Sequence, residues 1–138
     1  MAKFNPEVGK KSRDKFLGIV LGFETWIVLS WEVRFYESEF SSGGNHGRYP
    51  GFIPKKQIWL EIGLTLKNYD LCGVTIHEAL EAKILEVTRM TYNKAHEIAD
   101  YYEKKFRMFT LENGWDDSWD VCEMADYWAK IYLEEITR

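Results

Sequence analysis

The sequence predicts an α+β domain, in which a small antiparallel sheet of three strands from the N-terminal half packs against three C-terminal helices. A change in hydrophobic period carries this prediction. Apolar residues recur at every second position through much of residues 16–67, which is typical of strands. Over residues 70–138 they recur at intervals of three and four, which is typical of helices. We therefore expect a single domain over 1–138, with 1–15 loosely packed.

The first two strands are predicted at residues 17–23 and 27–35, where apolar side chains alternate with polar or small ones. The short Glu24–Thr25 connection between them predicts a β-hairpin. Apolar residues also fill much of Phe16–Trp31 after a basic start, which raises the question of a signal peptide or membrane anchor. Polar interruptions and the lack of about 20 clean apolar residues argue against a membrane segment.

A loop is predicted at residues 38–54, which are rich in Gly, Ser and Pro and contain His46 and Arg48. We interpret His46 as a solvated turn residue. The third strand is predicted at residues 58–66, and its edge is a candidate for aligning an extended substrate by strand addition.

The first helix is predicted to begin at Thr75 as N-cap, or as early as Asp70, and to end near Arg89. Its core stripe consists of Ile76, Leu80, Ile84 and Val87. The second helix is predicted from an N-cap at Thr91 to about Phe109. Its apolar seam consists of Tyr92, Ala95, Ala99, Tyr102, Phe106 and Phe109. A connection of only a residue or two between these helices predicts an antiparallel helical hairpin.

A stop at Asn113–Gly114 separates the second helix from the third. Asp116, Asp117 and Ser118 are predicted caps of this third helix, which we expect to end near Thr137. The spacing of this acidic group does not match a calcium loop. We interpret the six Trp residues as core rather than as a ligand platform.

A candidate site lies in V-T-I-H-E-A-L-E-A-K-I-L, residues 74–85. His77 and Glu81 are four residues apart, so a helix places them on one face, with Glu78 rotated away. Zinc peptidases use H-E-x-x-H, in which two imidazoles hold the metal and the Glu acts as general base. Glu81 stands where that motif has its second His, which could favour manganese or iron over zinc.

The second helix supplies two further candidates, because His96 and Glu103 lie beside its seam and seven residues apart. If the helical hairpin brings His96 to His77, then His77, Glu81 and His96 form a three-ligand set of the kind zinc accepts, with one position left for water. Glu78 would take a proton from that water. Glu103 is then a partner behind the ligands or an alternative metal ligand.

Other chemistries find less support. The net charge is −4 and the pI is about 5.4, so we expect no nucleic-acid partner. Cys72 and Cys122 form no C-x-x-C motif, which favours a reduced protein and a cytoplasmic location, of the host cell if the protein is viral. A disulfide between them stays an open alternative. No phosphate-binding Gly-rich loop and no G-x-S-x-G motif is present.

The region 53–115 resembles a group of small uncharacterised phage and prophage proteins. The resemblance rests on I-P-K-K-Q-I-W-L-E, Y-D at 69–70, I-H-E-A-L-E, Y-N-K-A-H-E-I-A-D-Y-Y-E and G-W at 114–115. It implies a zincin-like site, and its shared polar positions are His77, Glu78, Glu81, His96 and Glu103.

The leading functional hypothesis is a zincin-like metal-dependent hydrolase, a peptidase or amidase, with Glu78 as general base and a peptide or protein as substrate. Zinc is the expected metal, with manganese or iron as alternatives. A second hypothesis is a di-metal carboxylate protein that also uses Asp100. A third is a non-enzymatic viral or host-interaction module in which the polar cluster is structural. The oligomeric state stays open.

Overall fold

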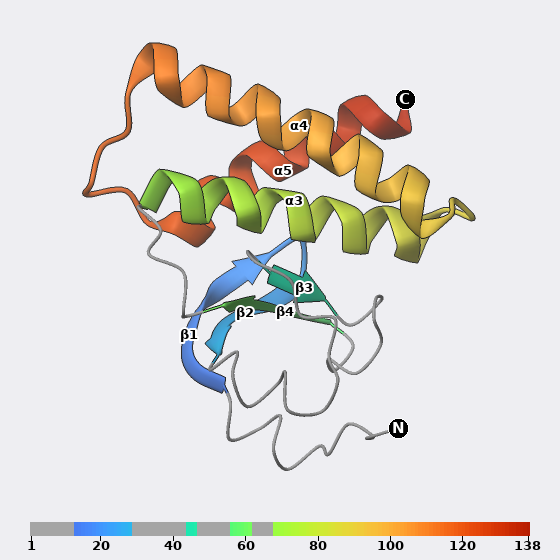
Figure 1. The fold of residues 1–138 in the computed structure, drawn as a ribbon, viewed down its shortest axis with the longest axis horizontal. Helices are drawn as coiled ribbons and strands as arrows, with labels where there is room; N and C mark the ends of the chain where they lie inside the picture. Colours follow the sequence, from blue (N-terminus) through green and yellow to red (C-terminus); the bar gives the residue numbers. More distant parts are fainter. Residues whose placement is uncertain (1–12, 29–43, 47–55, 62–67) are drawn as a thin grey trace.

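The computed structural model describes residues 13–28, 44–46, 56–61 and 68–138. In this part of the chain, one mixed sheet of four strands lies on one side and three helices lie together on the other (Figure 1). The α+β class predicted from the sequence is therefore confirmed. The predicted strand residues 29–35 and 62–66, and most of the predicted loop at 38–54 with Arg48, lie outside the described residues.

The strands are β1 (Arg13–Val20), β2 (Phe23–Val28), β3 (Gly44–His46) and β4 (Gln57–Glu61), in the order β1-β2-β4-β3. β1 pairs with β2 and β3 pairs with β4 in antiparallel fashion, but β2 and β4 are parallel. The prediction of a purely antiparallel sheet was thus wrong. A parallel pair needs a long crossover connection, and the residues between β2 and β4 provide one.

The hairpin between β1 and β2 turns at Leu21–Gly22, not at Glu24–Thr25 as predicted. Leu21 and Gly22 have φ angles of 51° and 85°, the left-handed backbone that a tight two-residue turn requires. Glu24 and Thr25 instead lie within β2. The backbone N–H of Leu21 donates a hydrogen bond of 2.8 Å to Asp126 Oδ1, which ties the hairpin tip to a C-terminal helix.

Residues 44–46 within the predicted loop form the short strand β3. Because β4 pairs with β2 on one side and β3 on the other, residues 57–61 lie inside the sheet. We expected the predicted third strand to form an exposed edge of the sheet. Over residues 57–61 it does not, because both of its sides are paired.

Helix α3 (Asn68–Val87) is the central element of the helical layer. It contacts β1, β3 and β4 on one side and two further helices on the other, so residues all around it are buried. It begins before Thr75, whose hydroxyl donates to the Leu71 carbonyl within the helix and therefore does not cap it. Val87, predicted as core, is 53% exposed because it lies at the helix end.

Helix α4 (Tyr92–Asn113) runs antiparallel to α3, after a connection over residues 88–91 (Figure 1). The predicted caps are confirmed, since Thr91 Oγ1 accepts a hydrogen bond from the Lys94 N–H and Gly114 ends the helix. The connection is longer than predicted. Two of its residues, Thr88 and Met90, are linked by a backbone-to-hydroxyl hydrogen bond of 3.1 Å.

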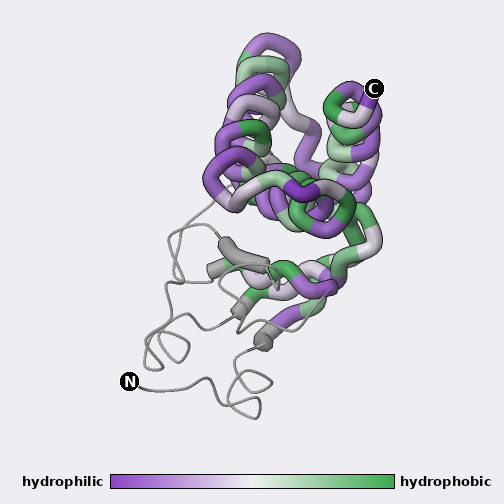
Figure 2. Tube along the Cα trace, turned by 90° about the vertical axis from the view of Figure 1, so that its right-hand side faces the viewer, coloured by the Kyte–Doolittle hydropathy of each residue, from purple (hydrophilic) through white to green (hydrophobic). Residues whose placement is uncertain are grey.

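Helix α5 (Val121–Thr137) starts later than predicted, because its N-cap is Asp120, which accepts from the Glu123 N–H. Asp116 instead accepts a hydrogen bond from the Ser118 N–H in the preceding turn. Each helix alternates between hydrophobic and hydrophilic residues along its length (Figure 2).

The core lies between the helices and the sheet and includes small residues on the helices, among them Ala79, Ala99 and Ala125. Cys72 and Cys122 are buried and form no disulfide with each other. None of the helices described in the structure is long and apolar enough to cross a membrane.

Candidate metal centre

Helix α3 carries three ionisable side chains in the interior: His77, Glu78 and Glu81, which are 5%, 7% and 2% exposed. A buried carboxylate costs several kcal/mol unless a positive charge or hydrogen-bond donors compensate it. Burying two carboxyl groups on one turn of a central helix, next to an imidazole, therefore lowers the stability of the fold relative to apolar residues at the same positions. Clusters of this kind are frequent at functional sites, which makes this one the candidate site.

The sequence left open whether the two histidine-bearing helices bring their histidines together, and the structure shows that they do. His96, near the start of α4, places Nδ1 2.8 Å from Glu81 Oε2 and 3.2 Å from His77 Nε2. His77 Nε2 is itself 3.2 Å from Glu81 Oε2. Ala95 and Ala99, which flank His96 on α4, are fully buried, and small residues there let the two helices approach closely.

The atoms His77 Nε2, Glu81 Oε2 and His96 Nδ1 form a compact triangle with the size of one face of a metal polyhedron. Tetrahedral zinc with bonds of 2.0–2.1 Å keeps its ligand atoms about 3.3–3.4 Å apart. The His96 side chain is 51% exposed, so the triangle opens toward solvent on this side.

The second ring nitrogen of His77 faces Glu103 from α4. His77 Nδ1 is buried and has no well-aligned hydrogen bond within the described structure, but Glu103 Oε1 lies 2.8 Å away as its ionic partner. Burial lowers the pKa of His77, yet the Glu103 and Glu81 carboxylates outweigh burial and raise this pKa to about 10. A carboxylate behind a histidine fixes the ring orientation and leaves the other nitrogen for a metal.

Glu103 is held in turn by a chain of ion pairs that runs along both helices. Its Oε2 accepts from Arg107 Nε at 2.9 Å, and Arg107 donates to Asp70 Oδ1 at 2.5 Å. Burial raises the pKa of Glu103, but His77 and Arg107 reverse this and hold the pKa below its usual value. The carboxylate behind His77 is thus kept charged and in place by a cation.

Gly73 makes room for this chain. A Cβ atom at position 73 would lie 3.3 Å from the Arg107 guanidinium carbon, a tight contact. The guanidinium therefore lies across bare helix backbone between Asp70 and the centre of α3. This explains a glycine inside a helix, where it costs about 1 kcal/mol relative to alanine.

Glu78 lies outside the ligand triangle and outside the chain of ion pairs behind it. Its Oε2 is 3.9 Å from His77 Nε2, at the edge of the triangle. Burial, followed by the negative charge of Glu81, holds the pKa of Glu78 well above its usual range. A carboxyl group in this environment exchanges a proton more readily near neutral pH than an exposed one.

A second set of potential ligand atoms lies on the other side of His77. One atom each from His77, Asp100 and Glu103 lie within 4.8 Å of one another. The Asp100 carboxylate is 42% exposed and pairs with Lys104 at 3.0 Å. Two of the three residues in this second group are half-buried and one is already paired with a lysine, whereas the first group is the compact one.

The sequence missed Asp70, Gly73 and Arg107 as parts of the site. Helical spacing held a weak signal, since Asp70 precedes His77 by seven residues and Arg107 follows Glu103 by four. His46 lies in β3, and the structure does not describe its side chain.

No family model, curated protein or solved structure matches this chain, so the candidate site rests on its own geometry.

Proposed function

We propose that this protein is a zincin-like metal-dependent hydrolase that cleaves a peptide or amide bond. The observation that carries the proposal is the convergence of His77 Nε2, Glu81 Oε2 and His96 Nδ1 at 2.8–3.2 Å, where two buried side chains meet a half-exposed histidine. These three atoms hold one divalent cation, with zinc as the leading candidate. Manganese and iron are the alternatives, because a carboxylate among the ligands suits harder metals.

A metal held by His77, Glu81 and His96 would supply a Lewis acid and would lower the pKa of a water in the site. The protein's own groups do the rest. Glu78, at the edge of the triangle, accepts the proton from the attacking water and passes it to the leaving amine. Glu103 orients His77 through Nδ1, and Arg107 keeps Glu103 in position. The exposed side of His96 is the entry for substrate.

A di-metal carboxylate protein is the second candidate, because His77, Asp100 and Glu103 offer a further set of ligand atoms. His77 would then contribute one ring nitrogen to each metal. This arrangement needs two cations per chain, whereas the hydrolase needs one. A structural network in a non-enzymatic interaction module needs none.

The deciding experiment is metal analysis by mass spectrometry on protein purified without chelator. We expect about one zinc, manganese or iron per chain, lost in His77→Ala and in Glu81→Gln. The matched control is Glu97→Gln, which makes the same charge change on α4, at a side chain 74% exposed. Glu97→Gln should keep the metal.

Glu78→Gln separates metal binding from catalysis. It should retain the metal but lose hydrolysis of a peptide library by about 10²-fold or more, as expected for removal of a general base. Two metals per chain would support the di-metal candidate instead. If zinc, manganese and iron all fail to bind or to change the melting temperature, the hydrolase proposal is refuted.

A further inference from the structure

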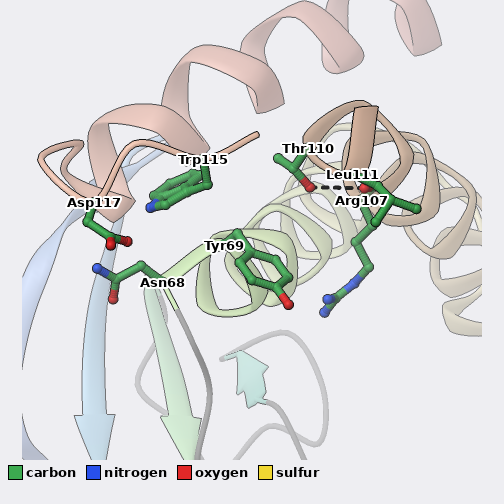
Figure 3. A pocket seen from close by; sticks show the side chains of 7 residues that line it. All are labelled: Asn68, Tyr69, Arg107, Thr110, Leu111, Trp115 and Asp117. Atoms are coloured by element: carbon green, nitrogen blue, oxygen red, sulfur yellow. Dashed lines mark hydrogen bonds between the residues drawn. The ribbon is translucent and has the colours of Figure 1, made fainter. Parts of the chain in front are cut away.

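A cleft of about 710 Å³ opens where the start of α3, the end of α4 and the segment before α5 come together (Figure 3). Its lining consists of Asn68, Tyr69, Arg107, Thr110, Leu111, Trp115 and Asp117. The ligand triangle is not part of this lining. Arg107 is the one residue that belongs both to the cleft and to the ion-pair chain behind His77.

The middle of the cleft is aromatic. Tyr69 from α3 and Trp115 from the segment after α4 both face the opening (Figure 3). Trp115 is held by an edge-to-face contact with Trp119, with ring centroids 5.2 Å apart. Trp115 is partly buried and packs against the core, as predicted for the tryptophans, while it also lines the cleft. Trp119 is 39% exposed and is an exception to that prediction. Aromatic faces of this kind attract cations as well as apolar groups.

The two ends of the cleft differ in charge. Arg107 lies at one end, but its charge is already offset by Asp70 at 2.5 Å and by Glu103 at 2.9 Å. Asp117 lies at the other end, with Tyr69 and Trp115 between it and Arg107 (Figure 3). Asp117 has no ion-pair partner within the described part of the chain. Asp117 is therefore the charged lining residue that has no counter-charge within the described part of the chain, whereas Arg107 is already paired.

We infer that this cleft binds the basic side chain, lysine or arginine, of an extended polypeptide. The cation lies against the Tyr69 and Trp115 rings and pairs with Asp117. N–H groups of Arg107 that are not used by the two carboxylates face peptide carbonyl oxygens. Charge complementarity selects this occupant. An acidic group would be repelled by Asp117, and it would gain little from Arg107, whose charge is already offset by Asp70 and Glu103.

This inference rests on the proposed function for the role of the polypeptide as substrate. Tyr69 precedes His77 by eight residues on α3, which corresponds to about 12 Å along the helix axis. An extended chain advances about 3.3 Å per residue, so the basic residue would lie about four residues from the bond that is cleaved. The hydrolase would then prefer substrates with lysine or arginine at that distance.

Binding is tested by nuclear magnetic resonance on the full chain labelled with ¹⁵N. The probes are Nα-acetyl-lysine methylamide and its uncharged counterpart, Nα-acetyl-norleucine methylamide. We expect the lysine probe to shift the indole signal of Trp115, assigned with Trp115→Phe, and to bind about 5-fold or more tightly than the norleucine probe. Asp117→Asn should weaken lysine binding about 3-fold or more.

The matched control is Glu112→Gln, which removes the same charge from an exposed position near the same end of α4. It should leave lysine binding within about 1.5-fold of the unmodified chain, since exposed charges outside the cleft are screened by salt. Equal binding of the two probes, or an equal effect of Asp117→Asn and Glu112→Gln, overturns the inference. Tighter binding of the corresponding glutamate probe also overturns it, because Arg107 would then be the recognising group.

The same titration with chelator present separates this inference from the proposed hydrolase. The cleft residues do not include the triangle, so lysine binding should persist without metal. Persistence in a protein that binds no metal would uphold the cleft and refute the hydrolase. Metal-dependent cleavage without any preference for a basic residue would do the reverse.

Discussion

Replacing Glu103 by glutamine tests whether this residue binds the metal or orients His77. Its Oε1 lies 2.8 Å from His77 Nδ1, on the far side of the ring from the ligand triangle. Loss of a carboxylate behind a histidine ligand weakens metal binding about 10–100-fold, or about 1.4–2.7 kcal/mol. Glutamine keeps an oxygen in this place, so we expect a loss near 10-fold for Glu103→Gln and near 100-fold for Glu103→Ala.

The assay is competition for zinc against a chromophoric chelator at fixed pH, with far-ultraviolet circular dichroism to establish that each variant is folded. Glu112→Gln, which changes the same charge on the same helix, serves as the control and should bind zinc as the unmodified chain does. His77→Ala sets the scale for loss of a true ligand. If Glu103→Gln weakens binding as much as His77→Ala, Glu103 is itself a ligand. If neither Glu103 variant has an effect, the contact with His77 has no role in metal binding.

Three further predictions concern the packing of α5 against β1 and the β1–β2 turn. Gly18→Ala should lower the free energy of unfolding, measured by urea titration, by about 1–3 kcal/mol. The reason is that the added Cβ would lie 2.7 Å from Cys122 Cβ and that φ at Gly18 is 152°. Gly22→Ala, with open space around it, should lower the free energy of unfolding by less. Asp126→Ala should cost about 1 kcal/mol and speed hydrogen exchange at the Leu21 amide, and an unchanged exchange rate would contradict the hydrogen bond. Burial raises the pKa of the Cys122 thiol to about 12, so this thiol ionises at lower pH in the unfolded chain than in the folded one. The free energy of unfolding should therefore fall as pH rises from about 9 to 12, and this fall should be smaller in Cys122→Ala.

The sequence was sufficient to predict the face of α3 that carries the site. Four-residue spacing places His77 and Glu81 together on any α-helix, whatever the rest of the fold does. The approach of His96 was a matter of tertiary packing, because it depends on which turns of α3 and α4 meet. That offset is set by the 88–91 connection and by the small Ala95, and neither can be converted into a distance from sequence alone.

Two other features were beyond sequence reasoning for different reasons. Alternation of apolar residues has the same period in parallel and antiparallel strands, so it could not reveal that β2 and β4 run in the same direction. Arg107 looked like an ordinary helix surface residue. Its role becomes visible only when Gly73, on another helix, is seen to offer bare backbone for the guanidinium.

The contact between Gly73 and Arg107 couples the substitutions that can be tolerated at two positions 34 residues apart. A larger residue at 73 would push the guanidinium away from Asp70 and Glu103, whereas loss of the arginine would free position 73 for alanine, the better helix former. Natural variants should therefore change the two positions together, with a small residue at 73 wherever arginine is kept. Such paired change could be sought among sequences too distant for overall similarity to reveal.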